Sequence, residues 1–232
     1  MKKIGIVIFI VAIVVGVVFA NLFSFGRASG QLFNFSFKSG IKGSGVAASE
    51  TRDASGFTGV DVGGIFQVEI TAGKDFSVAV DADDNLLQYI KTEVNGDVLH
   101  IETTERINST TPIRVRIAAP DIESIGASGA SKVSLAGVRN SSLHVDTSGA
   151  SKVKIEGETS EITVEVSGAS NVDAESLKAK TADVDASGAS SVNVFVTERL
   201  VSDASGASRI LYSGNPTSVE KKTSGASRVN QK

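Results

Sequence analysis

Short alternations of polar and apolar residues recur along this chain at a fixed distance. The tetrapeptide Ser-Gly-Ala-Ser begins at six positions spaced 18 to 20 residues apart: Ser128, Ser148, Ser167, Ser187, Ser205 and Ser224. Each copy is followed by a run such as Lys152-Val153-Lys154-Ile155, whose alternation has the period of a half-buried strand. A fixed period of this length indicates a stacked repeat. No unit holds a helical pattern of ten residues, which excludes solenoids built of helix pairs.

The repeat predicts an all-β fold, a right-handed parallel β-helix in which each unit of about 19 residues forms one coil and equivalent residues stack about 4.8 Å apart. A left-handed helix of hexapeptides needs a multiple of six, which fits this period poorly. The second residue after each tetrapeptide is expected to lie inside the coil. Together these residues form one internal column: Val133, Val153, Val172, Val192, Ile210 and Val229. The tetrapeptide alanines, Ala130 to Ala226, are expected to form a second internal column.

The tetrapeptide itself is interpreted as the tight corner of each coil. Its glycines allow backbone angles that a side chain would forbid, and they are Gly129, Gly149, Gly168, Gly188, Gly206 and Gly225. Its serines either bond backbone groups around the corner or stack as an outward hydroxyl ladder.

Two positions beside the corner carry charge in register. Two residues before it stand Asp146, Glu165, Asp185 and Asp203, bracketed by Gly126 and Lys222. Directly after it stand Lys132, Lys152, Asn171, Ser191, Arg209 and Arg228. Like charges in register repel, so the basic residues are expected to compensate the acidic ones in part across the corner. The charged members form either a solvated surface ladder or a strip that binds cations or glycans.

The first 48 residues differ from the rest. Residues 4–25 carry no charge and follow Lys2 and Lys3, and a membrane-spanning helix needs about 20 residues. Residues 1–25 are therefore either a transmembrane anchor with its N-terminus inside or a signal peptide with a cleavage site at residues 18–20. Residues 26–48 are expected to be a linker rich in Gly and Ser. Within it, the Phe-rich residues 32–37 form either an interfacial aromatic segment or a short strand.

Residues 49–232 are expected to form the β-helix domain. Its first part, residues 49–125, lacks the tetrapeptide but alternates like strands, and Asn95-Gly96 between two alternating runs is a strong hairpin signal. We interpret this part as irregular opening coils and a hairpin that cap the regular repeats of residues 126–232, because terminal repeats are usually atypical.

The order of these segments resembles a known bacterial family. The hairpin sequence Asn95-Gly96-Asp97, the run Arg114-Val115-Arg116-Ile117-Ala118-Ala119-Pro120 and the Ser-Gly-Ala-Ser corners together resemble the "putative auto-transporter adhesin, head GIN domain" family over about residues 49–232. The resemblance implies a right-handed β-helix and an exported location in the bacterial envelope. It supplies no catalytic residues.

The search for chemistry finds no catalytic, cofactor-binding or metal-binding site. His144, Asp146 and Ser148 alternate along one stretch, but the serine recurs in every corner and the histidine does not, so a triad is not expected. The acidic run that begins at Asp81 starts like a calcium loop, yet Leu86 stands where that loop needs glycine. Cysteine is absent, which excludes thiolate metal sites and thiol catalysis.

We therefore expect a non-enzymatic envelope protein, anchored in the cytoplasmic membrane with its domain outside the cytoplasm, or secreted if the signal is cleaved. Its regular faces suit adhesion or the binding of glycans and other envelope polymers. The alternatives are a structural or sensory module that binds an envelope protein, and a carbohydrate-active enzyme using the acidic column. A net charge of −3 gives no indication of nucleic acid as a partner.

Overall fold

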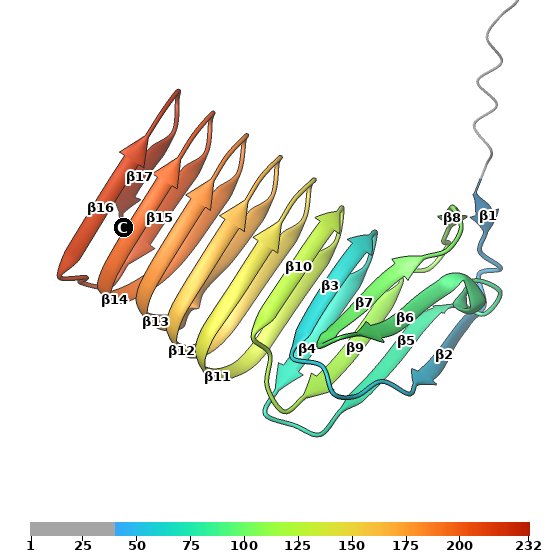
Figure 1. The fold of residues 1–232 in the computed structure, drawn as a ribbon. Helices are drawn as coiled ribbons and strands as arrows, with labels where there is room; N and C mark the ends of the chain where they lie inside the picture. Colours follow the sequence, from blue (N-terminus) through green and yellow to red (C-terminus); the bar gives the residue numbers. More distant parts are fainter. Residues whose placement is uncertain (1–39) are drawn as a thin grey trace, which may run out of the picture. The chain divides into compact units, whose positions relative to one another are not determined.

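The predicted alternation forms strands throughout residues 40–232, the part of the chain that the computed structural model describes (Figure 1). The anchor or signal expected in residues 1–25 and the aromatic segment at 32–37 lie outside the described residues. Among residues 40–232, no helix is both long enough and apolar enough to cross a membrane. The first strand and the start of the second fall inside the range expected to be linker.

The strands are β1 (Ile41–Lys42), β2 (Ala47–Arg52), β3 (Gly59–Gly64), β4 (Gln67–Ala72), β5 (Ser77–Asp83), β6 (Ile90–Asn95), β7 (Val98–Thr103), β8 (Ile107–Asn108), β9 (Arg114–Ala119), β10 (Ser124–Gly129), β11 (Lys132–Thr147), β12 (Lys152–Val166), β13 (Asn171–Ala186), β14 (Ser191–Ala204), β15 (Arg209–Ser213), β16 (Ser218–Thr223) and β17 (Arg228–Gln231). One 3₁₀ helix, η2 (Leu87–Tyr89), follows β5.

The predicted all-β fold, a right-handed parallel β-helix, is confirmed (Figure 1). Each of the long strands β11 to β14 runs along one face of the flattened coil, bends, and returns along the opposite face. The first parts of these strands continue the sheet that holds β4 and β9, which we call the β4 face. Their last parts continue the sheet that holds β3 and β7, which we call the β3 face.

The core lies between the two faces and is built of stacked columns. Val133 pairs with Val153, and the column continues through the predicted residues to Val229, all of them buried. In the other direction it extends through Val68 to Val115, in the part of the chain that has no tetrapeptide. Because the coils have nearly equal lengths, equivalent positions lie at the same depth in the core and carry the same type of residue.

Each tetrapeptide turns the chain from the β3 face to the β4 face. The six corner glycines have φ between +72° and +78°, a region that disfavours side chains. A Cβ atom on any of them would lie only 2.5 to 2.7 Å from the carbonyl oxygen of the glycine one coil earlier. The N–H of each corner alanine donates to that same oxygen at 2.7 to 2.8 Å. The glycines therefore stack in direct backbone contact.

The prediction that the corner alanines point inward is wrong. Ala130 and its five equivalents are exposed, while the second serine of the first five corners, beginning with Ser131, is buried. Ser131 Oγ donates to Gly64 O (3.0 Å), and Ser208 Oγ donates to Ala186 O (3.0 Å). The first serines line the outer surface as a hydroxyl ladder, half-buried in the first five corners. The two serines thus adopt both of the predicted roles.

The N-terminal part caps the stack with antiparallel strands rather than with coils alone. β3, β4, β7 and β9 continue the parallel stack, but β5 runs antiparallel to both β9 and β2, and β6 runs antiparallel to β7. The predicted hairpin joins β6 to β7, with Asn95 paired to Val98. The view of residues 49–125 as opening coils therefore holds for four strands only.

A buried carboxylate fixes this cap. Asp83 is fully buried and accepts hydrogen bonds from the N–H groups of Gly45 (2.9 Å) and Thr110 (2.8 Å) and from the Ser109 hydroxyl (2.9 Å). Burial by itself raises the pKa of Asp83, but these bonds, with a longer one from the Thr111 N–H, outweigh it and hold the pKa below the usual 3.8. Asp83 therefore ties the β1–β2 connection to the segment after β8.

At the C-terminal end of the stack, an apolar core column turns polar. Val164 and Val184 are followed in the same inward column by Ser202 and then by Lys221 of β16. Lys221 Nζ lies 4.7 Å from the centre of the Tyr212 ring and donates to Val229 O (3.4 Å). An inward-pointing charge on an edge strand discourages the addition of another strand.

Candidate binding surface

The basic column runs along the β4 face. Lys132 pairs with Lys152, and the register continues through Asn171, Ser191 and Arg209 to Arg228. Gln67 and Arg114 extend it by two rungs toward the N-terminal cap. The column therefore holds five cations, three neutral polar residues and no carboxylate along eight rungs. Its cations are all exposed.

The acidic column runs along the β3 face, on the other side of the same corner. Asp146, Glu165, Asp185 and Asp203 occupy four consecutive rungs and are all exposed. The column continues through Gly126 to Asp61 and His100, which lie 3.2 Å apart between Oδ2 and Nδ1. At its other end stands Lys222.

The expected compensation across the corner does not take the form of ion pairs. Within residues 40–232, no carboxylate oxygen of Asp146, Glu165, Asp185 or Asp203 lies within 4.0 Å of a charged nitrogen. In the same range, no charged nitrogen of the five cations in the basic column lies within 4.0 Å of a carboxylate oxygen. The two columns lie on opposite faces, which is why their side chains do not reach one another. Both remain open to external partners.

A shallow groove of about 370 Å³ follows the basic column on the β4 face. The groove is lined by two outward columns. The first is the basic column, with Gln67, Lys132, Lys152 and Asn171, and the second mixes both signs of charge, with Glu69, Ser134, Lys154 and Asp173. The hydrogen bond from Lys154 Nζ to Glu156 Oε1 (2.6 Å), together with their charge attraction, raises the pKa of Lys154. Lys132 and Lys152 have no such partner among the described residues. The groove therefore offers two free ammonium groups one rung apart.

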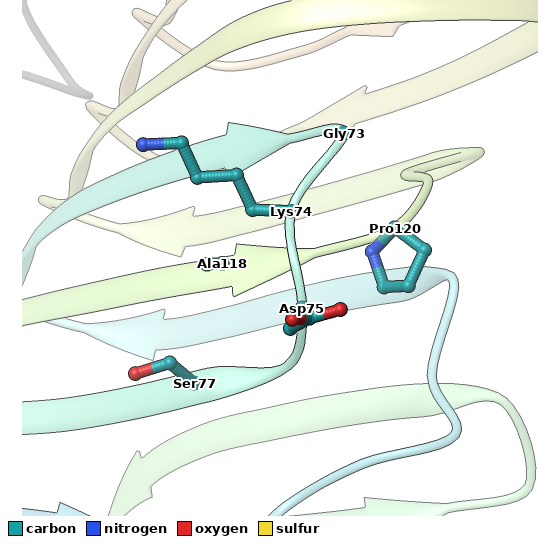
Figure 2. A pocket seen from close by; sticks show the side chains of 6 residues that line it. All are labelled: Gly73, Lys74, Asp75, Ser77, Ala118 and Pro120. Atoms are coloured by element: carbon teal, nitrogen blue, oxygen red, sulfur yellow. The ribbon is translucent and has the colours of Figure 1, made fainter.

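A surface hollow of about 730 Å³ lies at the β4–β5 loop and lacks the features of a catalytic site. Its polar side chains are Lys74 and Asp75 of the loop and Ser77 at the start of β5. Figure 2 shows the Lys74 side chain extending away from Asp75. Nucleophilic or acid–base catalysis needs side chains that converge on one reacting atom.

A third hollow, about 550 Å³, is more apolar. It lies beside β8 and is walled by Ile107, Pro112 and Ile113. Ile65, at the corner between β3 and β4, borders it with 76% of its surface exposed. This is the most exposed large apolar side chain of the described domain.

The arrangement of corners, hairpin and stacked columns agrees with the sequence comparison. A sequence model of the family described as "Putative auto-transporter adhesin, head GIN domain" matches residues 56–216. The chain belongs to this family. The matched range covers the GIN domain from just before β3 to just after β15. No curated protein matches the chain.

A solved structure shares the architecture of this GIN domain, and others are similar at lower TM-scores. A protein described as a "putative adhesin" from Bacteroides fragilis is similar with a TM-score of 0.69 and 19% identity, over 83% of this chain and 100% of that one. A "putative lipid binding protein" from Parabacteroides distasonis gives 0.49, with 17% identity over 83% and 99%. A "putative adhesin" from Parabacteroides merdae gives 0.48, with 15% identity over 83% and 98%. At 19% identity, the first likeness shows the fold alone.

The residues weighed for catalysis are on the surface of the GIN domain. His144 and Asp146 are both exposed on the β3 face, and Ser148 is the first serine of a corner. The four carboxylates of the acidic column are equally exposed. Glycoside cleavage needs two carboxyl groups with different roles, placed on the two sides of one scissile bond. The four carboxylates of the acidic column instead occupy equivalent, exposed rungs of one ladder.

Sequence reasoning missed the N-terminal rungs of both columns, Gln67 and Arg114 on one face and Asp61 and His100 on the other. The signal that identifies these rungs is a degenerate corner, Gly-Gly-Ile-Phe at residues 63–66. Its second glycine stacks directly against Gly129, and its Phe is buried where the later corners have serine. Aligning this corner with Ser-Gly-Ala-Ser would have placed Asp61 and Gln67 in their columns.

Proposed function

We propose that the chain is a non-enzymatic, exported envelope protein that binds anionic polymers along its β4 face. The basic column carries this proposal, because it holds five cations and no carboxylate along eight rungs. Export rests on the apolar residues 4–25, which act as an anchor or signal, and on the family's description as an adhesin. The GIN domain then lies in the periplasm or outside the cell.

The geometry suits an extended chain better than a small molecule. Rungs about 4.8 Å apart make a straight line of charge along the solenoid axis, and a linear polymer can follow that line over several coils. Lys132 and Lys152 meet acidic groups at the groove, and Arg209 and Arg228 meet them farther along. Asn171 and Ser191, between the two pairs, offer hydrogen bonds to hydroxyl groups.

The test measures binding of the full chain, kept in solution with a nonionic detergent, to an immobilised polyuronate and to a neutral glucan. The variant replaces Lys132, Lys152, Arg209 and Arg228 by Gln. Exposed ion contacts contribute about 0.2–1 kcal/mol each, so four lost contacts should weaken polyuronate binding by about fourfold or more. Added salt should weaken it as well.

A matched control separates the effect of the basic column on binding from the effect of net charge. It replaces four cations outside the column by Gln, namely Lys74, Lys91, Lys178 and Arg199, which changes the net charge equally. This control should bind like the parent chain. Equal losses in both variants would show that binding follows total charge and not the column, and equal binding to the neutral glucan would exclude ionic recognition.

The apolar hollow beside Ile65 favours a second candidate function, a module that binds an envelope protein. Ile65 joins Ile107, Pro112 and Ile113 around this hollow, and a contiguous exposed apolar patch is typical of an interaction site. A photo-crosslinker placed at position 65 in cells should then capture one protein species. The same crosslinker at Val46, which is 58% exposed elsewhere on the domain, should capture none.

A further inference from the structure

The two charged columns are complementary to one another in sign and in spacing. Both are produced by the same coils, so both advance by one rung, about 4.8 Å, per coil. Both lie beside the tetrapeptide corner, one on each face, and both run along the solenoid axis. For each column, a second copy of the chain therefore carries a column of opposite charge with the same repeat.

Neither column is neutralised inside the described domain. Asp146, Glu165, Asp185 and Asp203 stack as like charges with no ion pair, and so do Lys132 and Lys152. Like charges in register on one sheet face disfavour the isolated molecule. A ladder of opposite charge with the same repeat relieves this repulsion on both surfaces at once.

We propose that copies of this chain stack laterally, with the basic column on the β4 face of one copy against the acidic column on the β3 face of the next. Two copies related by a translation keep their corners on the same side, so the columns overlap along their length. The contact joins two different faces, so it leaves one face free on each outer copy. Such heterologous contacts build open arrays rather than closed dimers.

The order of charges favours a stagger of one coil. With no axial shift, Arg228 would face Lys222 of the neighbour, a like-charge pair. Moving the neighbour by one coil instead places Arg228 opposite Asp203, Arg209 opposite Asp185 and Lys132 opposite Asp61. In this register Lys152 faces Gly126, and no rung brings like charges of the two columns together.

The experiment measures self-association of the full chain in nonionic detergent by sedimentation velocity. Because the pairs are exposed, association should be weak and salt-sensitive: the screening length is about 10 Å at 0.1 M ionic strength and about 3 Å at 1 M. The mean sedimentation coefficient should rise with concentration at about 0.02 M salt and stay at the monomer value at about 0.5 M. Association that is absent at low salt, or that does not change with salt, would overturn the proposal.

Two charge-reversal variants test which faces meet. The β4-face reversal replaces Lys132, Lys152, Arg209 and Arg228 by Glu, and the β3-face reversal replaces Asp146, Glu165, Asp185 and Asp203 by Lys. Each variant alone has the same charge on both faces and should not associate, whereas their mixture should associate at least as strongly as the parent chain. Unchanged melting temperatures show that both remain folded. A mixture that stays monomeric would overturn the pairing of these faces.

The same variants separate this proposal from polymer binding. The β3-face reversal keeps the basic column, so it should lose self-association while still binding polyuronate. The β4-face reversal should lose both. If the parent chain binds polyuronate but never self-associates, stacking is wrong and the proposed function stands. If it self-associates but does not bind polyuronate, the proposed function fails and stacking stands.

Discussion

The corner of the coil can be tested by adding a single methyl group at Gly168. This glycine lies in the middle of the glycine stack, with φ of +72°, and a Cβ atom there would lie 2.6 Å from the Gly149 carbonyl oxygen. Gly73 provides a matched control, because its φ is +80° but no atom lies within 4 Å of its Cβ position. Comparing Gly168→Ala with Gly73→Ala therefore separates backbone strain from contact between coils.

The magnitudes follow from the two contributions. The left-handed backbone conformation costs a residue with a side chain about 1–2 kcal/mol, and both variants bear this cost. Gly168→Ala also forces two coils apart at a backbone contact, and overpacking of this kind costs about 1–3 kcal/mol more. For a domain of this size, 1 kcal/mol lowers the melting temperature by about 2–4 °C. Gly168→Ala should therefore melt about 2–12 °C below Gly73→Ala.

Thermal unfolding followed by circular dichroism at 218 nm, a wavelength typical of β-structure, measures this difference. Gly168→Val should be more damaging still, because a β-branched side chain tolerates positive φ poorly. Ser170→Ala, in the same corner, removes only a long hydrogen bond from the Ser151 N–H (3.4 Å) and should cost about 0.5–1.5 kcal/mol. Equal melting temperatures for Gly168→Ala and Gly73→Ala would refute the view that coils stack through their glycines.

Three further changes test the core and the two ends of the domain. Leu143→Ala should lower the free energy of unfolding by about 2–5 kcal/mol, whereas Ile65→Ala should change it by about 0.5 kcal/mol or less; urea unfolding measures both. Asp83→Asn should melt below the parent chain at pH 7 while exposed Asp84→Asn does not. Because the folded-state pKa of Asp83 lies below its usual 3.8, its contribution is present above the usual value and is lost as the pH falls through the folded-state pKa. The melting-temperature gap between the parent chain and Asp83→Asn should therefore narrow as the pH is lowered into the acid range; a constant gap would exclude the carboxylate charge as its source. Lys221→Val should expose an apolar edge and produce end-to-end oligomers in light scattering that high salt does not disperse, and a monomer would show that the inward charge is not what protects the edge.

The stacked columns could be predicted from the sequence because the coil length hardly varies. Val153 and Val172 are 19 residues apart, and Val172 and Val192 are 20 apart. Small bulges in the middle of the long strands, away from the corners, absorb the difference. A residue's depth in the core therefore follows from its distance to the nearest corner. The charged columns could be read from the sequence for the same reason.

Residue character is a poor guide to the direction of side chains within the corner. Apolar character alone suggests that Ala130 points inward and Ser131 outward. The period-two alternation instead continues through the corner, with Ala127, Ser131 and Val133 all buried, so the serine points inward and the alanine outward. The buried hydroxyls of Ser131 and Ser208 donate to backbone carbonyls that are within reach only after the coils have stacked. The hydroxyls of Ser151 and Ser190 are buried without a hydrogen-bond partner in the part of the chain that the structure describes.

The N-terminal cap was only partly predictable, because its pairings are long-range. Alternation identifies β5 and β9 as strands but not their antiparallel pairing, which depends on where the chain returns after the η2 turn. The acidic run beginning at Asp81 looks like a surface turn in the sequence. Asp83 is buried only because Gly45 and Thr110, 38 residues before it and 27 after it, close over it.

A regular coil makes surface charge a collective property. In an irregular globular protein, a charged residue adds one isolated charge to the surface. Here the same position in every coil belongs to one line of side chains. The corner separates two such lines of opposite sign by the thickness of the domain, so each must find its counter-charges outside. If both proposals hold, an anionic polymer and the acidic column of a neighbouring copy would compete for the same basic column, so each polymer bound to the β4 face would remove one contact between copies. Stacking and polymer binding would then be two uses of one surface, with the local concentration of polymer deciding between them.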